Sequence, residues 1–305
     1  MITYEYLKNK AGAFRSLTGL TVREFDQLFA EGVERYDEAE QARLDRPGRQ
    51  RRRGAGHPFK NEVRERLLMG LVWLRVYPTY EVLGVLFNLH KSNVMRNLKP
   101  MLSLLAEATS CELTWPLEGQ RKKRMAEVMT DYPEVRAIVD ATEQPTRRPK
   151  EKTAQKTHYS GKKKRHTLKT QITVAPDGRL REVSDSVPGS VPDITLLRQT
   201  GTLARLEEDE EAMFDAGYQG IRKDAPDHTL HHPYRASRGH PLTDEQKAAN
   251  RVLSHYRIVV EHTLAHLKRF QVLAHVYRHA RDEYNLTFRV VAGLTNRRLV
   301  SLSIA

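Results

Sequence analysis

Three acidic residues lie where the side chains of a metal site are expected. Asp215 follows a short apolar segment and precedes a glycine turn, and Asp140 ends a second apolar segment. Both patterns predict a buried strand that carries a carboxylate at the open end of a sheet, where active sites of mixed α/β folds lie. Glu261 lies in a long amphipathic segment that predicts a helix. Hard divalent cations prefer oxygen ligands, so the three acids together predict a metal site.

The helix predicted over residues 243–270 also places two basic residues beside Glu261. Arg257 precedes Glu261 by four residues and Lys268 follows it by seven. At 100° per residue these offsets put the three side chains on one helix face. The apolar stripe expected to pack this helix consists of Val252, Tyr256, Val259, Val260, Thr263, Leu264, Leu267 and Phe270. Glu261 is expected at the edge of that stripe, whereas a purely structural glutamate would face water.

The segments before this helix predict a mixed sheet. Strands are expected over residues 134–141, 164–174 and 180–186, followed by a helix over residues 193–206 and a strand that ends at Asp215. A turn is expected over residues 175–178 and a closing helix over residues 284–302. The order β-β-β-α-β-α, with acids after the first and fourth strands and on the next helix, resembles the ribonuclease H-like fold. The expected fold class is therefore mixed α/β and α+β, with helices on both faces of the sheet.

The first third of the chain predicts helices only. Residues 1–45 read as helical, with a capping box from Thr21 to Glu24. Helices are also expected over residues 62–76 and 79–87, and a third is capped by Ser92 and continues past Pro100. Exposed residues at the start of the third helix are expected to be Ser92, Asn93, Arg96 and Asn97. This spacing fits a DNA-reading helix-turn-helix and a plain three-helix bundle equally well.

The charge of the chain favours a polyanionic partner. Its 305 residues include 51 Lys and Arg against 38 Asp and Glu, a net charge of +13. Such an excess is typical of nucleic-acid binding, although a basic surface kept for solubility also produces it. Clustering favours nucleic acid, because basic runs occur over residues 49–53, 121–124 and 147–169. The candidate phosphate contacts in these runs are Arg51, Arg52, Lys163 and Lys164.

Composition excludes several other classes. No apolar run approaches the ~18 residues that a membrane span needs, and the N-terminus lacks the pattern of a signal peptide. One cysteine, Cys111, allows no internal disulfide and no cysteine zinc cluster. A reducing cytoplasm fits these features. Four histidines between residues 228 and 240 raise a zinc hypothesis, but without a neighbouring cysteine a basic DNA-contacting loop is preferred.

Five stretches in one order resemble the DDE-type transposases of bacterial insertion sequences, in a branch related to the Harbinger transposases. They are Val139–Glu143, Lys164–Gly178, Val187–Asp193, Phe214–Gly220 and Arg257–Phe270. Residues 16–105 resemble the helix-turn-helix region of the same family. The resemblance implies three domains: a helical segment with a basic linker (1–58), a helix-turn-helix region (59–110) and a ribonuclease H-like catalytic domain (111–305) with an irregular insertion near residues 221–242.

The resemblance also implies the roles of the site residues. Asp140, Asp215 and Glu261 match the catalytic triad, which holds two Mg²⁺ ions, or Mn²⁺. Asp140 is implied to bridge both ions, and Arg257 and Lys268 to contact DNA near the cut. Glu143 fits either a supporting role behind the metal ligands or a surface acid. Departures from the family occur at Pro192, Ser254 and His262, where relatives carry other residues.

The implied function is a transposase that binds the terminal inverted repeats and catalyses strand cleavage and strand transfer. Double-stranded DNA is the implied partner, with a homodimer holding two element ends, no membrane association, and a cytoplasmic, nucleoid-associated location. Two alternatives stay open: a domesticated DNA-binding protein without transposition, and a nuclease that cuts without strand transfer.

Overall fold

The computed structural model describes residues 1–45, 59–110, 113, 132, 134–207 and 210–304. Predictions for Arg51, Arg52, Cys111 and the basic run 121–124 therefore lie outside the described residues. The chain forms two compact units. The first comprises residues 1–111, 268–274 and 286–294, and the second comprises residues 112–267, 275–285 and 295–305. No described helix is long and apolar enough to cross a membrane.

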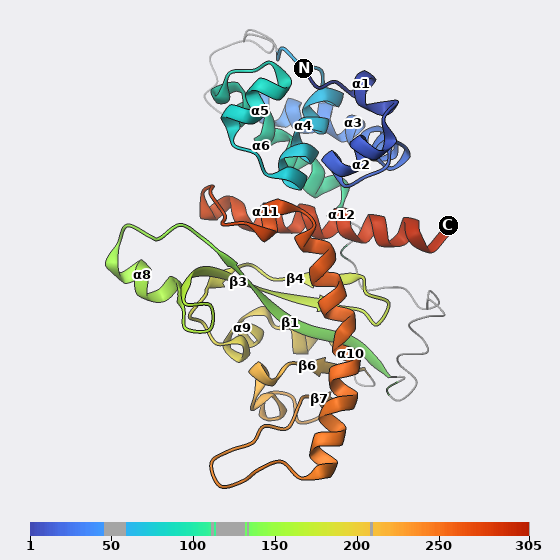
Figure 1. Ribbon diagram of the computed structural model, residues 1–305. Coiled ribbons are helices and arrows are strands. Elements are labelled where there is room, and N and C mark those ends of the chain that lie inside the picture. The colour runs from blue at the N-terminus through green and yellow to red at the C-terminus, as the bar shows by residue number, and fades with distance from the viewer. Residues whose placement is uncertain (46–58, 111–112, 114–131, 133, 208–209, 305) are drawn as a thin grey trace. The chain divides into compact units, whose positions relative to one another are not determined.

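The first unit is helical, as the sequence predicts (Figure 1). Its helices are α1 (Tyr4–Lys8), α2 (Ala11–Thr18), α3 (Val22–Leu44), α4 (Val63–Val76), α5 (Tyr80–Phe87), α6 (Lys91–Ala108) and α11 (Gln271–Ala274). The Thr21–Glu24 capping box is confirmed: the Glu24 N–H donates to Thr21 Oγ1 at 3.2 Å and the Thr21 N–H donates to Glu24 Oε2 at 2.7 Å. Apolar residues of α4, including Trp73, lie at the centre of this unit and are almost fully buried.

The α4–α5–α6 segment forms the three consecutive helices that the sequence predicts, which both a helix-turn-helix and a three-helix bundle require. Tyr77 ends α4 and Asn88 ends α5, both in the left-handed backbone region. The cap of α6 is His90 rather than the predicted Ser92, because the His90 Nδ1 accepts the Ser92 N–H at 3.4 Å. The helix therefore begins two residues earlier than expected, and it continues past Pro100 to Ala108.

The second unit is a mixed sheet with helices (Figure 1). Its strands are β1 (Val135–Pro145), β2 (Tyr159–Ser160), β3 (Arg165–Val174), β4 (Leu180–Val183), β5 (Val187–Pro188), β6 (Glu211–Phe214) and β7 (Leu230–His231). The main path is β2-β3-β1-β6-β7, and β4 and β5 also pair with β3. Strand β1 is antiparallel to β3 and parallel to β6, which is parallel to β7.

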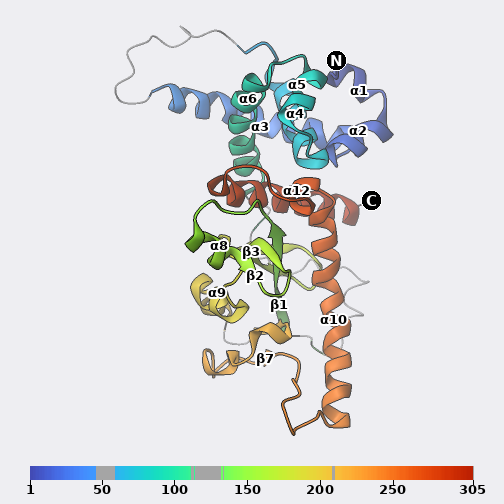
Figure 2. The ribbon, with the colours of Figure 1, turned by 60° about the vertical axis from the view of Figure 1, so that its left-hand side comes forward.

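The helices of the second unit cover both faces of the sheet. Its long helix α10 (Asp244–Lys268) and the shorter α9 (Asp193–Thr200) lie on opposite sides of the strands (Figure 2). On the α9 side, Leu197 packs with Ala137, Val139 and Phe214 in one buried cluster. Because side chains alternate along a strand, even-numbered residues of β1 such as Asp140 point to the α10 side. On that side Thr263 Oγ1 donates to the carbonyl of Gly178 at 2.7 Å.

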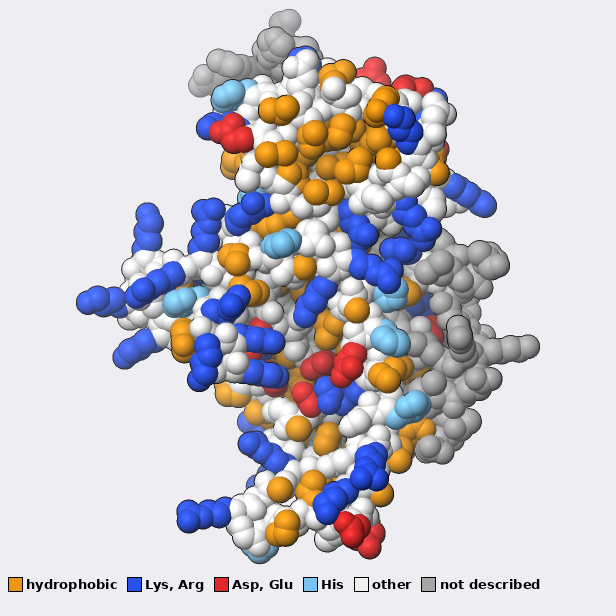
Figure 3. Space-filling model, in the orientation of Figure 1, with side chains coloured by type: hydrophobic (Ala, Val, Ile, Leu, Met, Phe, Trp, Pro, Cys, Tyr) orange, Lys and Arg blue, Asp and Glu red, His pale blue; other side chains and the backbone are white. Residues whose placement is uncertain are grey.

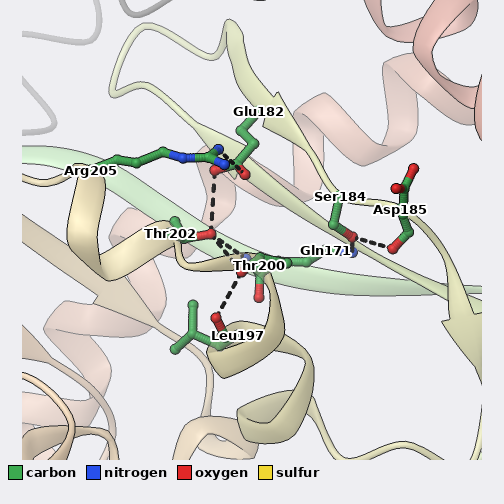
Figure 4. A network of polar contacts seen from close by, with 8 residues as sticks. All are labelled: Gln171, Glu182, Ser184, Asp185, Leu197, Thr200, Thr202 and Arg205. Atoms are coloured by element: carbon green, nitrogen blue, oxygen red, sulfur yellow. Dashed lines mark hydrogen bonds and ion pairs between the residues drawn. The ribbon is translucent and has the colours of Figure 1, made fainter.

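The C-terminal end of α9 is fixed by polar contacts with β3 and β4 (Figure 4). Gln171 Nε2 of β3 donates to Thr202 Oγ1 at 2.9 Å and to Thr200 Oγ1 at 3.2 Å. The Thr202 hydroxyl also contacts Glu182, which pairs with Arg205. Gly201, with φ +66°, separates α9 from the 3₁₀ turn Thr202–Arg205. The helix predicted over residues 193–206 is therefore two elements, because glycine adopts this backbone readily.

Further boundaries differ from the sequence prediction. Helix α8 (Lys152–His158) was not expected, since its residues show no apolar period and none of them is buried. The irregular segment 221–242 contains β7, which extends the sheet beyond β6. In α10 the buried residue of the first turns is Leu253, whereas Val252 of the predicted stripe is 38% exposed. Helix α12 (Tyr284–Ile304) confirms the closing helix.

Candidate active site

Asp140 and Asp215 lie at neighbouring strands of the sheet. The parallel register pairs Val139 of β1 with Phe214, the last residue of β6, so Asp140 and Asp215 each follow a paired residue. Asp215 comes directly after its strand as predicted, but Asp140 lies within its strand, because β1 continues to Pro145. Both face α10, where Arg257 Nη1 lies 3.1 Å from Asp215 Oδ1. The Asp215 side chain also caps a short 3₁₀ turn, accepting the Ala216 N–H at 2.5 Å. Two carboxylates and one guanidinium thus meet at this edge, whereas the sequence predicted the two aspartates together with Glu261.

The environment of Asp140 disfavours its charged form. Burial and the negative charge of Asp215 raise the pKa of Asp140 from 3.8 to about 6. The Ala141 N–H, which donates to Asp140 Oδ1 at 2.7 Å, and the cations of Arg257 and Lys162 act in the opposite direction. Because burial dominates, two neighbouring carboxylates are held here with less compensating charge than they need. A divalent cation would supply that charge.

Glu261 lies on the same helix as Arg257, one turn further along, and it is exposed. Lys268 ends α10, is also exposed, and belongs to the first unit. Among the described residues no group of three or more His, Cys, Asp or Glu side chains is close enough to hold a metal ion. The structure therefore brings together Asp140, Asp215 and Arg257, and it does not bring Glu261 into the same cluster.

The residues at this edge nevertheless fit a hard divalent cation. Asp140 and Asp215 supply carboxylate oxygens, which Mg²⁺ and Mn²⁺ prefer. The pKa of Asp140 is raised chiefly by burial, with a smaller contribution from the charge of Asp215, so a cation bound here would stabilise the charged carboxylate. The Arg257 guanidinium already contacts one of the oxygens that a metal would use. The donor set therefore agrees with a metal requirement.

Basic residues surround the acidic pair. In the second unit, a small group of Asp and Glu side chains is surrounded by Lys and Arg side chains on the surface (Figure 3). The turn between β2 and β3 carries Lys163 and Lys164, both exposed as predicted for DNA contacts, and Lys164 adopts a positive φ of 53°. The neighbouring Lys162, not singled out from the sequence, acts electrostatically on Asp140. Only the fold, which turns this loop toward β1, could reveal that effect.

The start of α6 presents the predicted DNA-reading residues. Ser92, Asn93 and Arg96 are exposed. Asn97 was expected beside them, but it is only 3% exposed, and its side-chain amide donates to the carbonyl of Asn93 at 2.6 Å. The prediction for Asn97 is wrong because α6 turns that position toward the other helices of the unit. Asn97 therefore has a structural role, whereas Asn93 is exposed as predicted.

The structure also decides two questions that the sequence left open, the exposure of Glu143 and the zinc hypothesis for the histidines of residues 228–240. Glu143 is not a surface acid, since its side chain is 6% exposed and pairs with Lys169. Of the four histidines near residues 228–240, His231 is within hydrogen-bonding distance of Glu211, with Nε2 2.7 Å from Oε2. Among the described residues these histidines form no metal-binding group.

Comparisons with known proteins identify the family of this chain. Residues 139–296 match the family described as DDE superfamily endonuclease, and residues 62–111 match the helix-turn-helix of DDE superfamily endonuclease. The chain therefore belongs to the DDE-type transposases of insertion sequences, with a DNA-binding helix-turn-helix before the endonuclease region.

A curated relative covers nearly the whole chain. It is the probable transposase for insertion sequence element IS702 of Microchaete diplosiphon, 30% identical over 281 residues, which are 92% of this chain and 96% of that protein. No solved structure matches the chain.

Proposed function

We propose that this chain binds the terminal inverted repeats of an insertion sequence through its helical unit and cuts and joins DNA strands through Asp140, Asp215 and Glu261. The observation that carries the proposal is the pair of aspartates on adjacent parallel strands, facing Arg257 at 3.1 Å. The strand path β4-β3-β1-β6-β7, antiparallel on one side of β1 and parallel on the other, supports a ribonuclease H-like catalytic domain within residues 111–305. In this proposal, residues 1–58 are a helical segment with a basic linker, and residues 59–110 are the region that reads DNA.

Each group has a defined task in phosphodiester cleavage. Asp140 and Asp215, with Glu261 from α10, would hold divalent cations, Mg²⁺ or Mn²⁺ and two in number. Such ions activate the attacking oxygen and stabilise the leaving oxygen when bound. Arg257 and the Lys162–Lys164 turn contribute positive charge for the phosphates that flank the cut.

The reaction needs no covalent enzyme intermediate. A water oxygen attacks the phosphorus, the bond from phosphorus to the 3′ oxygen breaks, and the element end leaves as a 3′-hydroxyl. That hydroxyl then attacks a phosphorus of target DNA and displaces a second 3′ oxygen. The partner is double-stranded DNA of the nucleoid, and two copies of the chain hold two ends.

The test is a cleavage and joining assay on DNA that carries the repeats flanking this reading frame. Cutting at the repeat boundary in Mg²⁺, its loss in EDTA, and joining of a pre-cut 3′-hydroxyl end to a target plasmid are expected. Cutting without joining would identify a nuclease that lacks strand transfer. Specific binding without cutting in Mg²⁺ or Mn²⁺ would identify a domesticated DNA-binding protein and overturn the proposal.

A further inference from the structure

A second charged cluster lies on the face of the sheet opposite the two catalytic aspartates. Lys169 of β3 stands directly across from Glu143 of β1 in the antiparallel register. Its ammonium Nζ lies 2.6 Å from Asp193 Oδ1, 2.6 Å from the carbonyl oxygen of Val191 and 3.8 Å from Glu143 Oε1. The side chains of Lys169 and Glu143 are 8% and 6% exposed. Buried charges are stable only when paired and hydrogen-bonded, so this arrangement fixes the Asp193 carboxylate firmly.

The second carboxylate oxygen of Asp193, Oδ2, lies next to the loop that follows Asp215. A Cβ built on Gly217 would lie 2.5 Å from Asp193 Oδ2, too close for any real contact. Helix α9, which begins at Asp193, packs against the 3₁₀ turn Ala216–Tyr218. Tyr218 then buries its ring in the cluster that contains Leu197 and Phe214. Asp193 therefore limits where the backbone can run two residues after Asp215.

We propose that Asp193, anchored by Lys169, is a positioning residue that sets the place of Asp215 by holding Gly217 from the opposite face of the sheet. The inference rests on the proposed function, because it takes Asp215 to be a metal ligand. The Lys169–Asp193 ion pair lies on the α9 side of the sheet. The loop 215–218 runs to that side from the α10 side, since Asp215 contacts Arg257 of α10 and Tyr218 is buried against Leu197 of α9. A shift of Gly217 consequently moves Asp215 relative to Asp140, whose place is fixed by the β1–β3 register.

Gly217→Ala tests this contact with little other disturbance. Gly217 does not adopt a positive φ, so alanine fits its backbone. Since Gly217 is exposed, the loop can move outward instead of preventing folding. The matched control is Gly220→Ala in the same loop, where φ is +91° and a Cβ would meet no atom within 4 Å. That control strains the backbone without touching Asp193.

The measurement is Mn²⁺ binding to the full chain without DNA, by calorimetry, together with thermal unfolding. Gly217→Ala is expected to weaken Mn²⁺ binding by about tenfold or more, the usual scale for residues behind metal ligands. Gly220→Ala is expected to lower the unfolding temperature and leave Mn²⁺ affinity unchanged. Combining Gly217→Ala with Asp193→Ser, which removes Oδ2, should reduce the effect of the added methyl group to under about threefold.

Each outcome decides the inference. Parent affinity in Gly217→Ala overturns it, and so does an equal loss with and without Asp193→Ser. If Gly217→Ala does not fold, Asp193→Ser alone decides: weaker Mn²⁺ binding in a folded variant supports the positioning role, and unchanged binding overturns it. Asp215→Ala, measured in parallel, separates the two proposals. Equal binding by the parent and Asp215→Ala overturns the proposed metal site itself, whatever Gly217→Ala does.

Discussion

The two units present their functional side chains in contrasting ways. At the start of α6, Ser92, Asn93 and Arg96 are exposed on a helix whose buried face supplies its stability. At the sheet edge, Asp140 and Asp215 are partly buried, lie near one another, and are held by backbone N–H groups and Arg257. The proposed DNA-reading side chains can therefore be changed without affecting folding. At the proposed catalytic edge, by contrast, the fold would be more stable without the buried carboxylate charge.

The sharpest test of this contrast is removal of a carboxylate. Asp215→Ala, Asp140→Ala and Glu261→Ala are each expected to reduce cleavage by about a thousandfold or more, while binding to inverted-repeat DNA is kept. Cleavage gels and binding titrations on one DNA measure both. Asp224→Ala is the matched control, because Asp224 pairs with Arg198 in the same unit at 3.0 Å. Full cleavage by Asp215→Ala would refute the mechanism.

The sequence predicts features of the fold that depend on neighbouring residues, and it does not predict contacts between residues far apart in the chain. The presence of the predicted strands, the Thr21–Glu24 capping box and α10 follow from local patterns and are confirmed. The predicted end of the first strand is wrong, because β1 keeps pairing with β3 beyond residue 141, as far as Pro145. The pairing of Lys169 with Asp193 joins residues 24 positions apart through sheet register and helix docking. No local spacing encodes that contact. For the same reason the sequence could not show that Asn97 is buried.

The second prediction concerns stability and pH. The pKa of Asp140 is raised to about 6 in the folded protein against its usual 3.8. The folded state therefore holds the proton of Asp140 more tightly than the unfolded state does. The contribution of Asp140 to the free energy of unfolding falls as pH rises from about 4 to about 6. In EDTA at pH 7, Asp140→Asn should stabilise the protein by roughly 1–3 kcal/mol, and at pH 4 the difference should vanish.

Urea unfolding of parent and variant at both pH values measures this difference. The parent and the variant must be compared at each pH, because His279 changes the free energy of unfolding with pH in the opposite direction from Asp140. Burial, followed by the charges of Arg278 and Arg147, lowers the pKa of His279 to about 4. That histidine destabilises the folded state as pH falls from 6.5 to 4. A parent and variant with parallel pH curves would contradict the account of Asp140.

The third prediction concerns α6. Arg96→Ala should lose about 1–3 kcal/mol of discrimination between repeat-containing and scrambled DNA, with an unchanged unfolding midpoint. Competition binding at fixed salt measures the discrimination. Arg23→Ala, an exposed arginine of α3 in the same unit, should leave discrimination intact. Equal weakening on both DNAs would mean that Arg96 contacts phosphate only.

The smallest expected effect compares two asparagines of one helix. Asn97→Ala removes a buried amide and should destabilise the first unit by about 1–2 kcal/mol. Asn93→Ala changes an exposed side chain and should stay within about 0.5 kcal/mol. Unfolding midpoints of the two variants, measured side by side, test whether exposed side chains of α6 contribute little to stability and buried ones contribute more. A larger loss for Asn93→Ala would break the contrast.

In the proposed mechanism, the ion pair between Arg257 and Asp215 makes two binding equilibria interdependent. A cation that takes an oxygen of Asp215 weakens that carboxylate's attraction for Arg257, and the guanidinium becomes available to a DNA phosphate. Linkage is reciprocal, so DNA that engages Arg257 must tighten cation binding by the same factor. The proposed mechanism thus predicts that metal and DNA bind cooperatively, with Arg257 as the counterion of Asp215 until both are bound.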